Sequence, residues 1–135
     1  MTAVLAEQVE GLQGDVMALL LDTRKTAASI ERLLTKARTT STLFVRGQRL
    51  AELFGRRAAG LQERATNRSS QLSARKIQLL LLTKRLDHLA FLAGDEQPPQ
   101  LQRVKAALGK IETLIRRWAT NPTVEHHETT IRRNR

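Results

Sequence analysis

The amino-acid sequence predicts an all-α fold, an antiparallel four-helix bundle, from three observations. Apolar residues recur every three or four positions through four segments of the chain. Short polar stretches, of the length found between neighbouring bundle helices, separate these segments. In the fourth segment the apolar positions form a regular heptad seam. We therefore expect one bundle domain over residues 1–120, followed by a flexible basic tail over residues 121–135.

The first two predicted helices cover about residues 3–37 and about residues 43–67. Each has its apolar residues three or four positions apart, which indicates one buried side per helix. The short hydroxyl side chains at residues 39–42 mark the first turn, because Ser and Thr cap the starts of helices. Residues 66–70, Thr-Asn-Arg-Ser-Ser, mark the second turn, because such side chains hydrogen-bond their own backbone in turns.

The last two predicted helices cover about residues 71–93 and about residues 98–119. Gly94 closes the third helix, because glycine readily adopts the left-handed geometry that ends many helices. Acidic residues and two prolines then precede the fourth helix, and both are signals of a helix start. The heptad seam of the fourth helix consists of Leu101, Val104, Leu108, Ile111, Ile115 and Trp118.

The third predicted helix is apolar nearly all round, which is unusual for a helix that packs on one side only. At about 100° per residue, Leu79 and Leu86 share one side, whereas Leu81 and Leu92 point nearly the opposite way. A chain of this length cannot easily enclose a central helix. We therefore expect a homo-oligomer whose interface uses Leu81, Leu82, Leu89 and Leu92.

The positive charge is concentrated in one part of the chain. The whole sequence contains 23 Lys and Arg against 13 Asp and Glu, and residues 38–77 alone contain nine basic and two acidic residues. Eight of those nine are Arg, whose planar fork suits phosphate, so the pattern favours a nucleic-acid partner over the alternative of a solvated, solubilising surface. Few aromatic residues are available to stack on bases, so we expect backbone contacts. The candidate contact residues are Arg46, Arg49, Arg56, Arg57, Arg64, Arg68, Arg75, Lys76, Arg116 and Arg117.

Little in the sequence points to catalysis. There is no Cys, and neither the dinucleotide fingerprint nor the Walker phosphate loop occurs. His126 and His127 are adjacent, which is not helical metal-ligand spacing, and His88 has no paired nucleophile. We therefore expect no catalytic residue, metal or cofactor. Without a secretory signal or a long apolar run, we also expect a cytoplasmic protein with no membrane partner.

Two short motifs carry a family resemblance. Gly47-Gln48-Arg49-Leu50, preceded by Arg46, opens the second predicted helix, and Arg116-Arg117-Trp118 closes the fourth. Their order around a leucine-rich third helix, over roughly residues 43–118, resembles the accessory variability determinant (Avd) family of diversity-generating retroelements. In that family the motifs typically read Leu-Gly-Gln-Arg-Ile and Gly-Gly-Trp, so this chain differs at the residues around the shared ones.

The resemblance implies a basic four-helix bundle that assembles into a ring or barrel of five copies. It further implies binding to RNA or DNA together with the reverse transcriptase of the retroelement, in sequence diversification. Four-helix bundles encoded in ribosomal RNA intervening sequences are a related branch that the same residues fit. Two other classes of protein also fit the charge and the periodicity. One is a structural protein that coats nucleic acid in a virion or chromatin-like particle, and the other is a helical adaptor that binds only protein.

Overall fold

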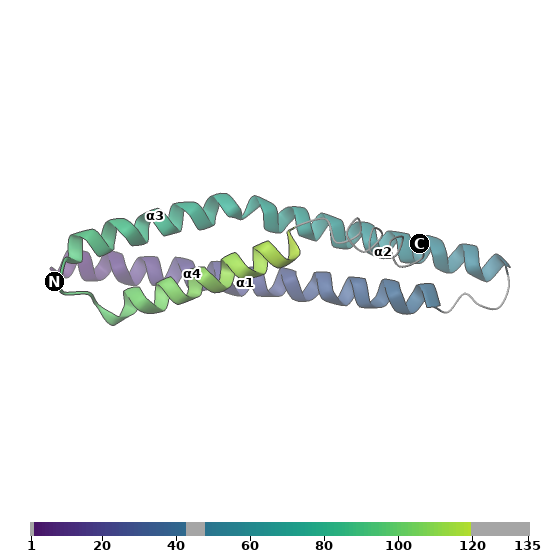
Figure 1. The fold of residues 1–135 in the computed structure, drawn as a ribbon, viewed down its shortest axis with the longest axis horizontal. Coiled ribbons are helices and arrows are strands. Elements are labelled where there is room, and N and C mark those ends of the chain that lie inside the picture. Colours follow the sequence, from purple (N-terminus) through teal and green to yellow (C-terminus); the bar gives the residue numbers. More distant parts are fainter. Residues whose placement is uncertain (1, 43–47, 120–135) are drawn as a thin grey trace, which may run out of the picture. The chain divides into compact units, whose positions relative to one another are not determined.

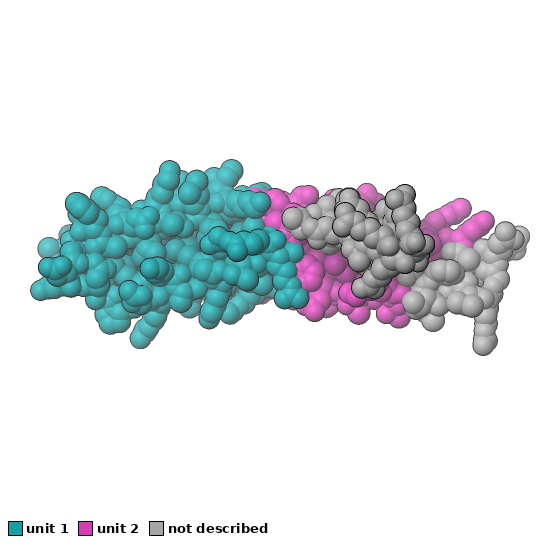
Figure 2. All heavy atoms as spheres, viewed as in Figure 1, with its two compact units in different colours: residues 1–24, 74–117 teal, residues 25–73, 118–135 magenta. Residues whose placement is uncertain are grey.

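The computed structural model describes residues 2–42 and 48–119, and within them it contains helices and no strand. Figure 1 shows the four helices, which are α1 (Ala3–Thr42), α2 (Gln48–Ala74), α3 (Lys76–Ala93) and α4 (Pro99–Trp118). The chain divides into two compact units (Figure 2). Unit 1 comprises residues 1–24 and 74–117, and unit 2 comprises residues 25–73 and 118–135. The all-helical fold class is therefore confirmed, and each unit has its own core.

Unit 1 is formed by the first part of α1 together with α3 and α4. The helix α4 begins at Pro99, where the fixed backbone angle of proline suits the first turn and its missing N–H costs nothing. Five of the six residues of the predicted seam are buried in this unit, and Ile111 is fully enclosed. The heptad seam is thus confirmed for unit 1, while Trp118 belongs to unit 2.

Unit 2 is built on the second part of α1 and most of α2. Its core contains Ile30, Leu33, Ala65 and Leu72, with Trp118 packed against it. The end of α4 is tied to α2 by two hydroxyl groups. Ser69 donates a hydrogen bond to the carbonyl oxygen of Trp118, and Ser73 donates one to the carbonyl oxygen of Ala119 at 3.1 Å. These bonds satisfy carbonyl groups that a helix end leaves without partners.

The predicted second turn at residues 66–70 is wrong, because α2 continues to Ala74. Hydroxyl side chains of the kind that often stabilise turns donate instead to backbone carbonyl oxygens of the same helix. Thr66 donates to the carbonyl oxygen of Gln62 at 3.0 Å, and Ser70 donates to that of Thr66 at 3.2 Å. The break comes instead at Arg75, a single residue whose φ of −73° and ψ of −11° remain right-handed helical. As a result α3 starts at Lys76 rather than at residue 71.

The first helix is longer than the sequence predicted, ending at Thr42 rather than at residue 37. The hydroxyl group expected to cap the next helix is used inside this one, since Thr39 donates to the carbonyl oxygen of Thr35 at 3.0 Å. The predicted start of the second helix at residue 43 and the predicted tail over residues 121–135 lie outside the described residues.

Gly94 ends α3 as the sequence predicted, with a positive φ of 61°. Its ψ of −129° differs from the left-handed helical geometry that was expected. Its N–H group reaches the carbonyl oxygens of Ala90 and Phe91, at 3.2 and 3.3 Å. The side-chain amide of Gln97 donates to the same carbonyl of Ala90 at 2.9 Å. These contacts close the third helix and lead the chain into α4.

Two of the four leucines assigned to an oligomer interface belong instead to the core of the single chain. Leu82 and Leu89 are buried, whereas Leu81 and Leu92 are exposed. The physical reason is that α3 has two neighbouring helices. It lines one groove together with α1 and another together with α4. A helix covered by two partners buries a wider sector than one apolar stripe. The surplus apolar surface of α3 is therefore smaller than the sequence indicated.

We expect Ile111→Ala to lower the free energy of unfolding by about 2–5 kcal/mol, because it removes a fully enclosed side chain from the seam. Leu53→Ala is the control. Leu53 is exposed, so its truncation should change that free energy by no more than about 0.5 kcal/mol. Chemical denaturation measures both, and equal effects would contradict the position of the seam.

A second expectation concerns Thr23, whose buried hydroxyl oxygen has no hydrogen-bond partner among the described residues. Thr23→Val keeps the shape of the side chain and removes the unsatisfied group, so the free energy of unfolding should rise by about 1 kcal/mol. Thr26→Val is the matched control, since Thr26 is also buried but has a partner. It should destabilise the protein in the same denaturation experiment, and a loss for Thr23→Val would contradict this description of the core.

Candidate nucleic-acid interface

The excess positive charge of the chain belongs to unit 2. Residues 25–73 contain ten basic and three acidic residues, whereas residues 1–24 and 74–117 together contain ten basic and eight acidic residues. Unit 1 is therefore nearly balanced. A surface with an excess of one sign of charge attracts a partner of the opposite sign. A polyanion site is therefore expected in unit 2.

A groove of about 640 Å³ runs between α1 and α2 in unit 2. Three basic side chains line it, Lys36 from α1 and Arg57 and Arg64 from α2, and none of the described residues that line it is acidic. The groove is open at Gly60, where an added Cβ atom would meet no other atom within 4 Å. We call this site the basic groove; its lining residues are Thr35, Lys36, Thr39, Thr40, Arg57, Gly60, Leu61 and Arg64.

The arginines of α2 extend the basic groove along the helix axis. Arg57, Arg64 and Arg68 are all exposed. At about 100° per residue they fall within roughly 40° of one another around α2. With a rise of about 1.5 Å per residue, Arg64 lies roughly 10 Å beyond Arg57, and Arg68 lies about 6 Å further on. The three guanidinium groups thus form a row beside the core of the unit.

These groups have no carboxylate to neutralise them in the described part of the chain. Within residues 2–42 and 48–119, neither Lys36 nor the exposed arginines of α2 form an ion pair. Ion pairs occur in unit 1, at Arg75, Arg85 and Arg116. The guanidinium group of Arg75 is 2.8 Å from a carboxylate oxygen of Asp22, and its side chain is only 15% exposed. Arg116 pairs with Glu112, one turn earlier on α4.

The ten candidate contact residues are therefore not one surface. Arg57, Arg64 and Arg68 share a face of α2, while Arg56 is exposed about 100° further round the helix. Arg75 and Arg116 are committed to carboxylates. Both Lys76 and Arg117 are exposed, in unit 1. Arg46 lies outside the described residues, and Arg49 is on α2 but its side chain lies outside the described part.

Lys36 and the threonines of α1 are the part of the site that the sequence analysis missed. The basic segment was taken to begin at residue 38, because the acidic start of the first helix hides its basic end. Four acidic residues precede unit 2, which begins at Lys25: Glu7, Glu10, Asp15 and Asp22. From residue 25 to residue 37 the helix contains Lys25, Arg32 and Lys36 against Glu31 alone. A charge count over the separate halves of the first helix would have pointed to Lys36.

Other chemistry finds little support in the described residues. They contain no group of three or more His, Cys, Asp or Glu side chains placed to hold a metal ion. His88 is exposed on α3, and the adjacent His126 and His127 lie outside the described residues. No helix over residues 2–42 and 48–119 combines the length and apolar character needed to cross a membrane.

Comparison of the chain with protein-family models, with curated proteins and with solved structures found no match. A function can therefore be inferred only from the basic groove and its surroundings.

Proposed function

We propose that this chain is a non-enzymatic nucleic-acid-binding protein whose contact surface is the basic groove of unit 2. The observation that carries the proposal is the meeting of Lys36, Arg57 and Arg64 on one groove, where no acidic residue belongs to the described lining. Like charges held together without a counter-charge favour an anionic ligand. The linear row formed with Arg68 suits a ligand that is itself linear, such as a nucleic-acid strand.

Contacts to phosphate, rather than to bases, fit this groove best. Its lining offers guanidinium, ammonium and hydroxyl groups, and among the described residues it contains no aromatic side chain on which a base could stack. Phosphate contacts position a nucleic acid but do not read its sequence. We therefore expect similar affinity for unrelated sequences, and binding to both RNA and DNA.

The proposal also includes an antiparallel four-helix arrangement and self-association. The ion pairs Asp15–Arg85 and Asp22–Arg75 support the antiparallel arrangement, because the residue further along α1, Asp22, meets the residue earlier in the chain, Arg75, which lies just before α3. The exposed leucines of α3 support an interface between copies. A ring or barrel of five copies is the form that the resemblance to Avd proteins implies.

The same resemblance supplies the proposed biological setting, a cytoplasmic accessory protein that assists a reverse transcriptase in retroelement-driven sequence diversification. Its test is the gene neighbourhood. We expect a reverse transcriptase gene with paired template and variable repeats beside the coding sequence, and their absence would favour a nucleic-acid-coating structural protein. A protein-only adaptor is the second candidate, favoured by the exposed apolar face of α3.

The basic groove is tested by reversing two of its charges. We expect the double variant Arg57→Glu, Arg64→Glu to bind labelled single-stranded RNA and labelled duplex DNA more weakly, by at least about tenfold at physiological salt. The slope of log affinity against log salt should also flatten, by about 0.7–0.9 for each lost phosphate contact. Fluorescence anisotropy over a salt series measures both quantities.

The control is Arg103→Glu, Lys110→Glu, which makes the same change in net charge on exposed residues of α4 in unit 1. It should weaken binding much less and keep the slope, because long-range charge is screened at physiological salt. Circular dichroism should show unchanged helix content for both variants. If the two double variants have the same affinity for nucleic acid, the basic groove is only a solvated surface. The protein-only adaptor then becomes the better proposal.

A further inference from the structure

One face of α3 is apolar and covered by nothing in the described chain. Five large apolar side chains there are between 51 and 82% exposed, and Phe91 is the most exposed of them. Together with two polar residues between them, they fall within a sector of roughly 120° around the helix. We call this surface the α3 face; it consists of Ile77, Leu80, Leu81, Lys84, His88, Phe91 and Leu92.

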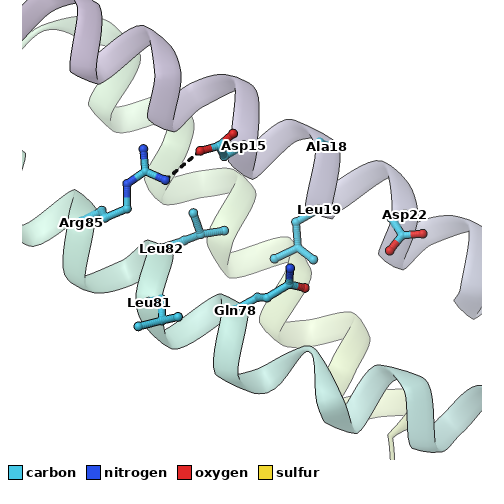
Figure 3. Close-up of a pocket in the computed structure, with 8 residues that line it drawn as sticks. All are labelled: Asp15, Ala18, Leu19, Asp22, Gln78, Leu81, Leu82 and Arg85. Carbon is cyan, nitrogen blue, oxygen red and sulfur yellow. Dashed lines mark hydrogen bonds and ion pairs between the residues drawn. The ribbon is translucent and has the colours of Figure 1, made fainter.

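The α3 face is bordered by a groove on each side, both within unit 1. The first groove, of about 600 Å³, lies between α1 and α3 and is lined by Leu81, Leu82, Gln78 and Arg85 on the α3 side (Figure 3). In this view Leu82 points toward α1, whereas Leu81 points away from it. The second groove, of about 490 Å³, lies between α3 and α4 and is lined by Leu79, Leu80 and Thr83, among others.

The spacing of the α3 face is symmetric about position 86. Leu80 and Leu92 are equally far from it along the chain, and so are Leu81 and Phe91, and Lys84 and His88. An antiparallel copy of α3 centred at this position therefore sets Leu80 against Leu92 and Leu81 against Phe91 toward the two ends of the face. Lys84 comes level with His88 at its centre, and Ile77 comes level with residue 95, beyond the end of α3. Contacts in which the same patch serves both subunits are the usual basis of two-fold dimers. We propose that a second copy of this chain docks on the α3 face, with the two α3 helices antiparallel about a two-fold axis beside residue 86.

The two grooves accept the end residues of the second copy. A two-fold antiparallel pair brings the same flank of each helix together. Phe91 lies on the flank of Leu80 and Thr83, so in the second copy it comes level with the groove between α3 and α4. Leu92 lies on the flank of Gln78 and Arg85, so in the second copy it comes level with the groove between α1 and α3. Each copy thus offers two projecting side chains and two grooves to receive them.

Charge selects the antiparallel direction. Lys84 and Asp87 lie on the same flank of α3. In the two-fold pair, Lys84 of one copy lies within about one residue, or 1.5 Å along the helix axis, of Asp87 in the other copy. Two symmetric ion pairs can therefore form. A parallel pair in register would instead set Lys84 against Lys84 of the second copy, which brings two like charges together. On the other flank, Arg85 is already held by Asp15 of its own chain, at 2.7 Å (Figure 3).

The size of the α3 face sets the expected strength of the pair. Five apolar side chains, each more than half exposed, offer on the order of 500 Å² per copy, within the range of the largest patch on a typical monomer. Two copies then bury about 1,000 Å², at the lower end for specific interfaces. We therefore expect a dimer that dissociates in the micromolar range.

This inference rests on the self-association included in the proposed function. It names the contact, and it gives a two-fold pair in place of the ring of five copies that the resemblance implies. Sedimentation equilibrium of the full chain tests it. The expected mass is twice 15.2 kDa, or a larger even multiple. A monomer at high micromolar concentration would overturn both the inference and the self-association. Five copies would overturn the two-fold pairing alone, and neither result affects binding of nucleic acid to the basic groove.

Two sets of variants locate the interface. Leu81→Arg should leave a folded monomer, since Leu81 is exposed. Leu53→Arg places the same charge at an exposed leucine of unit 2 and should leave the mass unchanged. Lys84→Glu alone and Asp87→Lys alone should each weaken dimerisation by about tenfold, and the double variant Lys84→Glu, Asp87→Lys should restore it to within about threefold. Equal masses for the two leucine variants, or no recovery in the double charge variant, would overturn the antiparallel pairing.

Discussion

The apolar side of α1 is the constraint on which the rest of the structure depends. It supplies residues to both cores, with Leu12 and Val16 in unit 1 and Ile30 and Leu33 in unit 2. Helical propensity alone does not make such a helix stable in water, and most of its stability comes from packing an amphipathic side. Because α1 runs as one element from Ala3 to Thr42, the same stretch of backbone serves two groups of partners. A loss of packing in either unit therefore removes part of the support for α1.

Local signals were read correctly from the sequence, and signals that depend on distant partners were not. The seam around Ile111 and the turn at Gly94 follow from spacing and from the backbone freedom of glycine. The turn expected at residues 66–70 was wrong because Ser69 finds its acceptor on Trp118, 49 positions away. For the candidate site, arginine density identified Arg57 and Arg64. Lys36 became recognisable only when α1 and α2 were seen to share a groove.

Charge and exposed apolar surface are divided between the two units. Ten basic residues against three acidic ones occur in residues 25–73, and among the large exposed apolar residues of the described chain only Leu53 belongs to that unit. The α3 face and its two grooves belong to unit 1, whose charges are nearly balanced and partly paired. A polyanion and an apolar partner thus have separate places to bind, so the two proposals can be tested by variants that do not overlap.

The hydrogen bonds that anchor the end of α4 restrict the residue types allowed on α2 more than those allowed at the end of α4. Ser69 and Ser73 donate through their side chains, whereas Trp118 and Ala119 accept through backbone carbonyl oxygens. Every residue type carries such a carbonyl, so position 119 can vary without loss of the bond. Positions 69 and 73 need a short hydroxyl side chain. Natural selection on this contact should therefore fall on α2, and homologous chains should keep Ser or Thr there while the end of α4 drifts.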